Sequence, residues 1–160
     1  MSGLDDLYQE LILDHSKRPH GKGLLGADPS TGSGTDSHVG ESHQRNPICG
    51  DEITLRARIT SSGSDADGDR IAAVSWEGSG CSISQASASM LTELVVGKSR
   101  AEASELIDGF REALRSRGAM ELDEDVYGDA AALTGVSRYV ARVKCAMLGW
   151  VALEDALRKA

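Results

Sequence analysis

The chain has 160 residues, a length that suits one domain with a single hydrophobic core. Its formal net charge of −8 repels the phosphate backbone of nucleic acids and anionic membrane surfaces, so we expect neither as a partner. No stretch approaches the roughly 18 apolar residues of a membrane span, and the acidic N-terminus has no secretory signal pattern. We therefore expect a cytoplasmic protein.

The first segment repeats with a helical period that Pro19 ends. Its apolar residues fall on one helical face: Leu4, Leu7, Tyr8, Leu11 and Ile12. Residues 28–45 differ sharply, because ten of these eighteen are Ser, Thr, Gly or Pro. Such a composition predicts a flexible insertion, placed inside a single domain that spans residues 1–160.

Two strands follow. Strict alternation of Ile53, Leu55, Ala57 and Ile59 with polar residues predicts a half-buried strand. A second strand is expected from Arg70 to Glu77, with Ala72, Val74 and Trp76 sharing one face. Only a short polar turn separates the strands, so we expect them to pair as an antiparallel hairpin.

The rest of the chain has helical patterns. One helix is expected from near Ser82, and Ser99 with Glu102 forms a capping box that opens the next. A short helical piece is expected at residues 129–133, and a final helix near Cys145. Together these elements predict an α+β fold, with a small antiparallel β-sheet packed against several α-helices.

The three cysteines are an odd number in a chain without export features, which argues against a disulfide framework. Cys81 directly precedes one expected helix, and Cys145 precedes or opens another, where free N–H groups favour thiolates. Cys49 lies in a Pro/Gly turn, two residues before Asp51. These four residues could converge into a tetrahedral zinc site, but buried structural cysteines remain an alternative because no C-x-x-C is present.

Four segments of the sequence resemble the SufU family, within the wider IscU-like superfamily. They are the opening LYQELILDH at residues 7–15, NPICGD at 46–51, GSGCSISQASASM at 78–90 and GVSRYVARVKC at 135–145. The resemblance covers nearly the whole chain outside residues 28–45. It implies a SufE/IscU-like fold.

The resemblance also implies a site and an activity. Zinc would be bound by Cys49, Asp51, Cys81 and Cys145, and Cys49 would accept sulfur, with Arg142 near the metal as a cation that favours thiolates. The protein would be a zinc-dependent sulfurtransferase for iron–sulfur cluster assembly. It would take persulfide sulfur from a SufS-like, pyridoxal-phosphate-dependent cysteine desulfurase, with a SufBCD-like complex as the downstream cluster scaffold.

Three other functions remain open. The same ligands could hold a [2Fe–2S] cluster in a scaffold protein. Against this, Lys144 stands where IscU scaffolds carry a histidine, and residues 139–143 lack the prolines of their chaperone-docking motif. A structural zinc module that only activates its partner is a second alternative. A cysteine hydrolase is a third, although no His–Asp pair is identifiable near any cysteine.

Two further patterns are interpreted as surface features. The four histidines, His15, His20, His38 and His43, are expected to be surface residues and not metal ligands. The acidic run at residues 65–69 is expected to be a solvated hairpin turn, because its spacing does not match a calcium loop.

Overall fold

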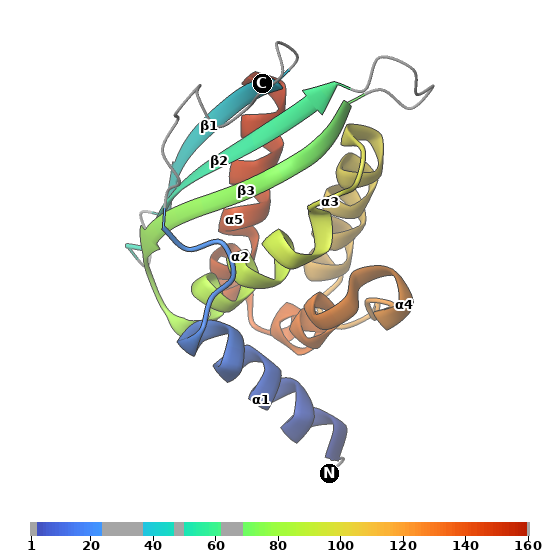
Figure 1. Cartoon of the computed structure of the whole chain (residues 1–160). Helices are drawn as coiled ribbons and strands as arrows, with labels where there is room; N and C mark the ends of the chain where they lie inside the picture. Colours follow the sequence, from blue (N-terminus) through green and yellow to red (C-terminus); the bar gives the residue numbers. More distant parts are fainter. Residues whose placement is uncertain (1–2, 24–36, 47–49, 62–68, 160) are drawn as a thin grey trace.

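A computed structural model describes residues 3–23, 37–46, 50–61 and 69–159 of the chain (Figure 1). Residues 65–68 of the expected acidic turn lie outside these ranges, and Asp69 begins a strand. The elements, in chain order, are α1 (Gly3–Lys17), β1 (Ser37–Arg45), β2 (Glu52–Ser61), β3 (Asp69–Ser79), α2 (Ser82–Val95), α3 (Arg100–Arg115), α4 (Glu124–Tyr127), the 3₁₀ helix η2 (Gly128–Arg138) and α5 (Val140–Lys159). The predicted α+β class is confirmed.

The described strands form one antiparallel sheet in the order β1-β2-β3. In β2 the alternation works as predicted, because Ile53, Leu55, Ala57 and Ile59 are all buried on one face. The expected pairing of β2 with β3 is also confirmed. The sheet therefore has one apolar face, which the helices cover.

The inner face of β3 differs from the prediction by one residue. Val74 and Trp76 are buried as expected, but Ile71, and not Ala72, is the next buried residue. The register explains this, because Arg58 pairs with Ala73 while Ile59 pairs with Ile71, which leaves Ala72 as an extra residue on β3. A bulge of this kind shifts the alternation and turns the larger side chain inward.

The prediction of a flexible insertion at residues 28–45 was wrong for its second half. Residues 37–45 form the edge strand β1, which pairs with β2 from Ser37–Thr60 to Arg45–Glu52. An edge strand gains its backbone hydrogen bonds from one neighbour and does not require an apolar pattern. The Ser42 hydroxyl also donates to Asp155 of α5 at 2.7 Å. Residues 28–36 lie outside the described residues.

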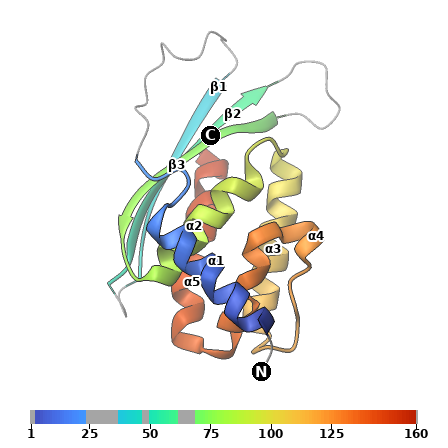
Figure 2. The ribbon, with the colours of Figure 1, turned by 60° about the horizontal axis from the view of Figure 1, so that its bottom comes forward.

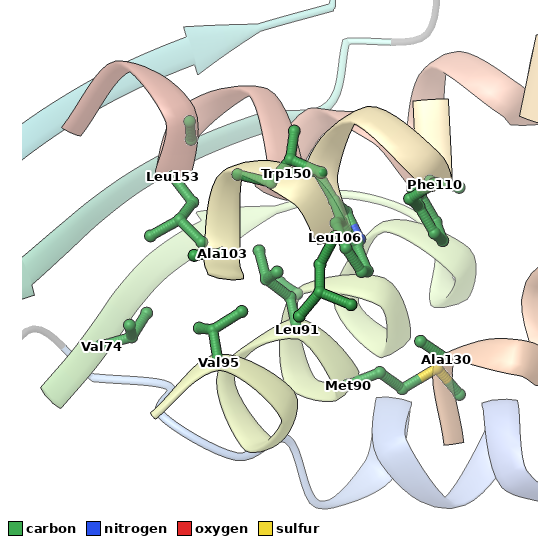
Figure 3. Close-up of a cluster of buried hydrophobic side chains, with 14 of the residues drawn as sticks. Val74, Met90, Leu91, Val95, Ala103, Leu106, Phe110, Ala130, Trp150 and Leu153 are labelled. Carbon is green, nitrogen blue, oxygen red and sulfur yellow. The ribbon is translucent and has the colours of Figure 1, made fainter. Parts of the chain in front are cut away.

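The helices gather on the apolar face of the sheet (Figures 1 and 2). Helix α5 packs against β1 and β2, and α2 packs between β3, α5 and α1. Figure 3 shows the core where these elements and α3 meet, including Val95, Leu106, Phe110, Trp150 and Leu153. The rings of Phe110 and Trp150 stack with centroids 3.7 Å apart.

Helix boundaries were predicted unevenly. The Ser99 half of the predicted capping box of α3 is confirmed, because the Ser99 hydroxyl accepts a hydrogen bond from the Glu102 N–H at 3.2 Å. Helix α5, however, begins at Val140, so Cys145 lies inside the helix and not at its start. The short helical piece expected at residues 129–133 is part of η2. Over the ranges described, no helix has both the length and the apolar composition to cross a membrane.

Candidate metal centre

Three of the four predicted zinc ligands come together at one end of the helical layer. Asp51 directly precedes β2, Cys81 caps the N-terminus of α2, and Cys145 lies in α5. One ligand atom from each lies within 4.8 Å of the others. The fourth predicted ligand, Cys49, lies outside the described residues. Segments separated by up to 94 positions in the sequence thus supply one compact cluster.

Asp51 is buried, with 3% of its surface exposed, and hydrogen bonds from α2 and its N-cap hold its carboxylate. Oδ1 accepts from the Cys81 N–H at 3.2 Å, and Oδ2 accepts from the Ser84 hydroxyl. A buried carboxylate needs such donors, because its desolvation is otherwise costly. Two backbone hydrogen bonds lie beside it: the Asn46 N–H donates to the Asp51 carbonyl at 2.7 Å, and the Gly50 N–H donates to the Asn46 carbonyl at 2.8 Å.

Cys81 occupies the predicted position at the start of α2. Its backbone is extended, with φ −70° and ψ 170°, and its carbonyl accepts the N–H of Gln85 at 3.2 Å. Sγ lies 3.8 Å from Asp51 Oδ2 and 3.8 Å from Ser84 Oγ. Cys81 is exposed, so this sulfur is the accessible member of the cluster among the described ligands.

Cys145 is buried, and close packing of α5 on α2 brings it to the cluster. The Ser87 hydroxyl of α2 donates to the carbonyl of Ala146 at 2.6 Å. One turn further along α5, Gly149 faces Ala88, and a Cβ at Gly149 would lie 3.4 Å from the Ala88 backbone. Because Ser87 and Ala88 of α2 and Ala146 and Gly149 of α5 are small, the two helices can pack closely.

Arg142 lies in the first turn of α5, three residues before Cys145 and so on the same side of the helix. Its guanidinium carbon is 5.4 Å from the centre of the exposed Tyr139 ring. The role expected for Arg142 remains a prediction.

Two residues important to this cluster were not singled out in the sequence. Ser84, three residues after Cys81, donates its hydroxyl to Asp51, and a polar residue at the third helical position commonly reaches back to the helix start. Gly80 gives Asp51 its space, because a Cβ there would lie 2.8 Å from Asp51 Oδ1. The pattern G-C-x-x-S before a helix was the available signal for both.

The donor set fits a zinc ion. Zinc binds cysteine sulfur at about 2.3 Å and carboxylate oxygen at about 2.0–2.2 Å in tetrahedral sites, so its ligand atoms lie roughly 3.3–3.8 Å apart. The 3.8 Å between Cys81 Sγ and Asp51 Oδ2 agrees with that spacing. The Ser84 hydroxyl bonded to Asp51 is the outer partner that such carboxylate ligands usually have.

Comparison with known proteins places the chain among a defined set of relatives. The family described as "NifU-like N terminal domain" matches residues 7–158. The chain is 39% identical to the zinc-dependent sulfurtransferase SufU of Bacillus subtilis, over 99% of this chain and 94% of that protein. It is 36% identical to the iron–sulfur cluster assembly scaffold protein IscU of Streptococcus pyogenes, over 99% and 87%. The crystal structure of a putative SUF-system scaffold protein from Fervidobacterium islandicum superposes with a TM-score of 0.62 at 34% identity, covering 92% of this chain and 94% of that one.

Proposed function

Because the chain belongs to the NifU-like N-terminal domain family, we propose that it is a zinc-dependent sulfur acceptor that takes persulfide sulfur from a cysteine desulfurase for iron–sulfur cluster assembly. The observation that carries the proposal is the convergence of Asp51, Cys81 and Cys145 within 4.8 Å. The similarity to a sulfurtransferase over 99% of the chain supports the same reading.

Cys49, Asp51, Cys81 and Cys145 are the proposed zinc ligands. Zinc held by these residues would keep its thiol ligands deprotonated near neutral pH, and it would not exchange electrons with a persulfide. Asp51 contributes a hard oxygen, fixed by Ser84 and the Cys81 N–H, and Cys145 contributes a sulfur anchored in a packed helix.

Cys49 is the proposed acceptor. Its thiolate attacks the terminal sulfur of the desulfurase cysteine persulfide, the desulfurase S–S bond breaks, and the desulfurase cysteine leaves as a thiolate. Cys49 then carries the persulfide, so the sulfur passes between chains with no net oxidation. Arg142, one turn from Cys145, is proposed as the cation that favours thiolates at this site.

The test uses mass spectrometry. The protein is incubated with a desulfurase and L-cysteine, and persulfides are trapped by alkylation and mapped to peptides. We expect the label on Cys49, and we expect none on the Cys49→Ala variant. The matched control is Cys81→Ala, which also loses one proposed ligand but retains the acceptor and should still be labelled at Cys49. Label on Cys81 or Cys145 of the unsubstituted protein, with Cys49 unlabelled, would overturn the assignment.

A second candidate function is that of a scaffold that binds a [2Fe–2S] cluster. The similarity to a protein named a scaffold, 36% identical over 99% of the chain, favours it. Lys144 argues against it, because this exposed ammonium group has no lone pair to offer iron where the scaffold proteins are expected to carry a histidine. Anaerobic purification followed by iron and sulfide analysis separates the two functions, since only the scaffold should contain both elements in stoichiometric amounts.

A further inference from the structure

A second group of metal-binding side chains lies toward the other end of α2. His15 from α1, His20 from the segment after α1 and Glu93 from α2 each place a ligand atom within 4.8 Å of the other two. Asp129 from η2 adds a carboxylate oxygen 2.9 Å from His15 Nε2. We call these four residues the histidine cluster. It shares no residue with the cysteine-containing centre.

His15 is the fixed member of the histidine cluster. The expectation that it is a surface histidine was wrong, because only 5% of it is exposed. Its Nδ1 lies 2.7 Å from the hydroxyl of Ser89, which orients the ring and turns Nε2 toward Glu93 and Asp129. A metal-binding histidine usually has its other ring nitrogen held by such a hydrogen bond.

His20 is positioned through its backbone. Its N–H donates to Ser89 Oγ at 2.8 Å, and its carbonyl accepts the indole N–H of Trp76 at 2.8 Å. Its ring centre lies 5.3 Å from that of His15. The same serine hydroxyl therefore sets the position of both histidines, which are five residues apart in the sequence.

The spacing of the cluster suits a small cation. Glu93 Oε2 is 3.7 Å from Nε2 of His15 and 3.7 Å from Nε2 of His20. A tetrahedral ion with ligands at about 2.0–2.1 Å separates its ligand atoms by roughly 3.3–3.5 Å, so the side chains need only small movements to bind one. Two facing carboxylates also supply the negative charge that a divalent cation requires.

From this arrangement we propose that the histidine cluster is a second metal site, which binds a divalent first-row transition ion such as Zn²⁺. Imidazole and carboxylate ligands without sulfur suit these ions, and nitrogen ligands disfavour Mg²⁺ and Ca²⁺. Binding selects the His15 tautomer with a proton on Nδ1, which is donated to Ser89 Oγ while Nε2 contacts the ion. The serine oxygen has two lone pairs, one for this bond and one for the His20 N–H.

Metal binding at the histidine cluster would link segments that are far apart in the sequence. The ion would join the end of α1 to α2 and to η2, elements that already pack together. This inference does not depend on the proposed sulfur transfer, because none of its ligands takes part in that reaction.

The test measures Zn²⁺ stoichiometry by isothermal titration and competition with a metal indicator, in protein whose tight site is already filled. We expect a second binding event near one equivalent, at least tenfold weaker in His20→Ala and in Glu93→Ala. Both side chains are about half exposed, at 56% and 53%, so these variants should fold. The matched control is His43→Ala, which removes a similarly exposed histidine whose ring contacts Glu52 at 2.9 Å and Thr54 Oγ1 at 2.8 Å. The control should bind the second ion unchanged.

Cobalt gives an independent readout. Co²⁺ at the histidine cluster should show only weak visible bands, because the intense sulfur-to-cobalt charge-transfer absorption requires a cysteine ligand. The side-chain nitrogen resonances of His15 and His20 should shift with the same titration, while those of His43 stay in place. If the unsubstituted protein with its tight site filled bound no further ion, the proposal would be overturned. A second event that persists in both His20→Ala and Glu93→Ala would overturn it too.

Discussion

The two clusters are built on the same helix but from different chemistry. At the N-terminus of α2, Cys81 and Ser84 meet Asp51 and Cys145, while Ser89 and Glu93 further along meet the two histidines. In each case a serine of α2 orients a buried ligand from another element: Ser84 holds Asp51, and Ser89 holds His15. The serines of α2 thus serve as outer partners that fix the ligands of their neighbours.

The two clusters differ in the chemical softness of their donor atoms and in their exposure to water. The first combines sulfur with one oxygen and buries Asp51 and Cys145. The second has only nitrogen and oxygen donors, and Glu93, Asp129 and His20 are each at least 43% exposed. Ligands that are exposed to water lose more hydration free energy when they bind an ion. We therefore expect the first cluster to bind zinc much more tightly than the second.

The largest expected effect comes from removing zinc from the tighter site. At a free zinc concentration a thousandfold above the dissociation constant, binding stabilises the fold by about 4 kcal/mol. For a chain of this size, that corresponds to a fall in melting temperature of about 10 °C on treatment with a strong chelator. Differential scanning calorimetry measures it. The chelator should have a much smaller effect on Cys81→Ala, and an equal fall in both proteins would contradict the assignment of this ligand.

A smaller effect is expected at the histidine cluster without any added metal. His15→Ala removes a buried ring with hydrogen bonds to Ser89 and Asp129, so we expect it to lower the free energy of unfolding by about 2–3 kcal/mol. His20→Ala truncates an exposed ring while its backbone bonds remain, and it should cost less than about 0.5 kcal/mol. Urea unfolding compares the two. Equal losses would show that His15 is not the fixed member of the cluster.

The smallest expected effect concerns the space around Asp51. In Gly80→Ala the new Cβ would lie 2.8 Å from Asp51 Oδ1, so the carboxylate must move. We expect zinc affinity to fall about tenfold, or about 1.4 kcal/mol, with little change at the histidine cluster. Gly135→Ala is the matched control, because its Cβ would meet nothing within 4 Å. Competition with a zinc indicator measures both. An unchanged affinity in Gly80→Ala would argue that Asp51 does not bind the ion.

Strong local patterns in the sequence were sufficient to predict several elements. The alternation in β2, the Ser99 N-cap and the position of Cys81 before α2 all follow from rules that act over a few residues. The α+β class followed from them. The convergence of Asp51, Cys81 and Cys145 was expected from a family resemblance, and local patterns would not have been enough to predict it.

The features that were missed depend on contacts between distant segments. Strand β1 has a polar sequence, and it is held in the sheet by backbone pairing with β2 and by the hydrogen bond from Ser42 to Asp155. The bulge at Ala72 changes which residues of β3 face inward. His15 looked like a surface residue because the serine that buries and orients it is 74 positions away. No local pattern contains that information.

The two tryptophans give the protein an optical readout of its own. Trp150 stacks on Phe110 and donates to Ser87, deep between α2, α3 and α5. Trp76 instead donates to the carbonyl of His20, and its backbone pairs with the segment that follows α1. Fluorescence from Trp150 therefore reports the integrity of the helical core. Fluorescence from Trp76 reports whether the segment after α1 is packed against β3. Replacing Trp150 with phenylalanine would leave Trp76 as the remaining tryptophan, so the docking of the segment after α1 could be followed by tryptophan fluorescence in real time.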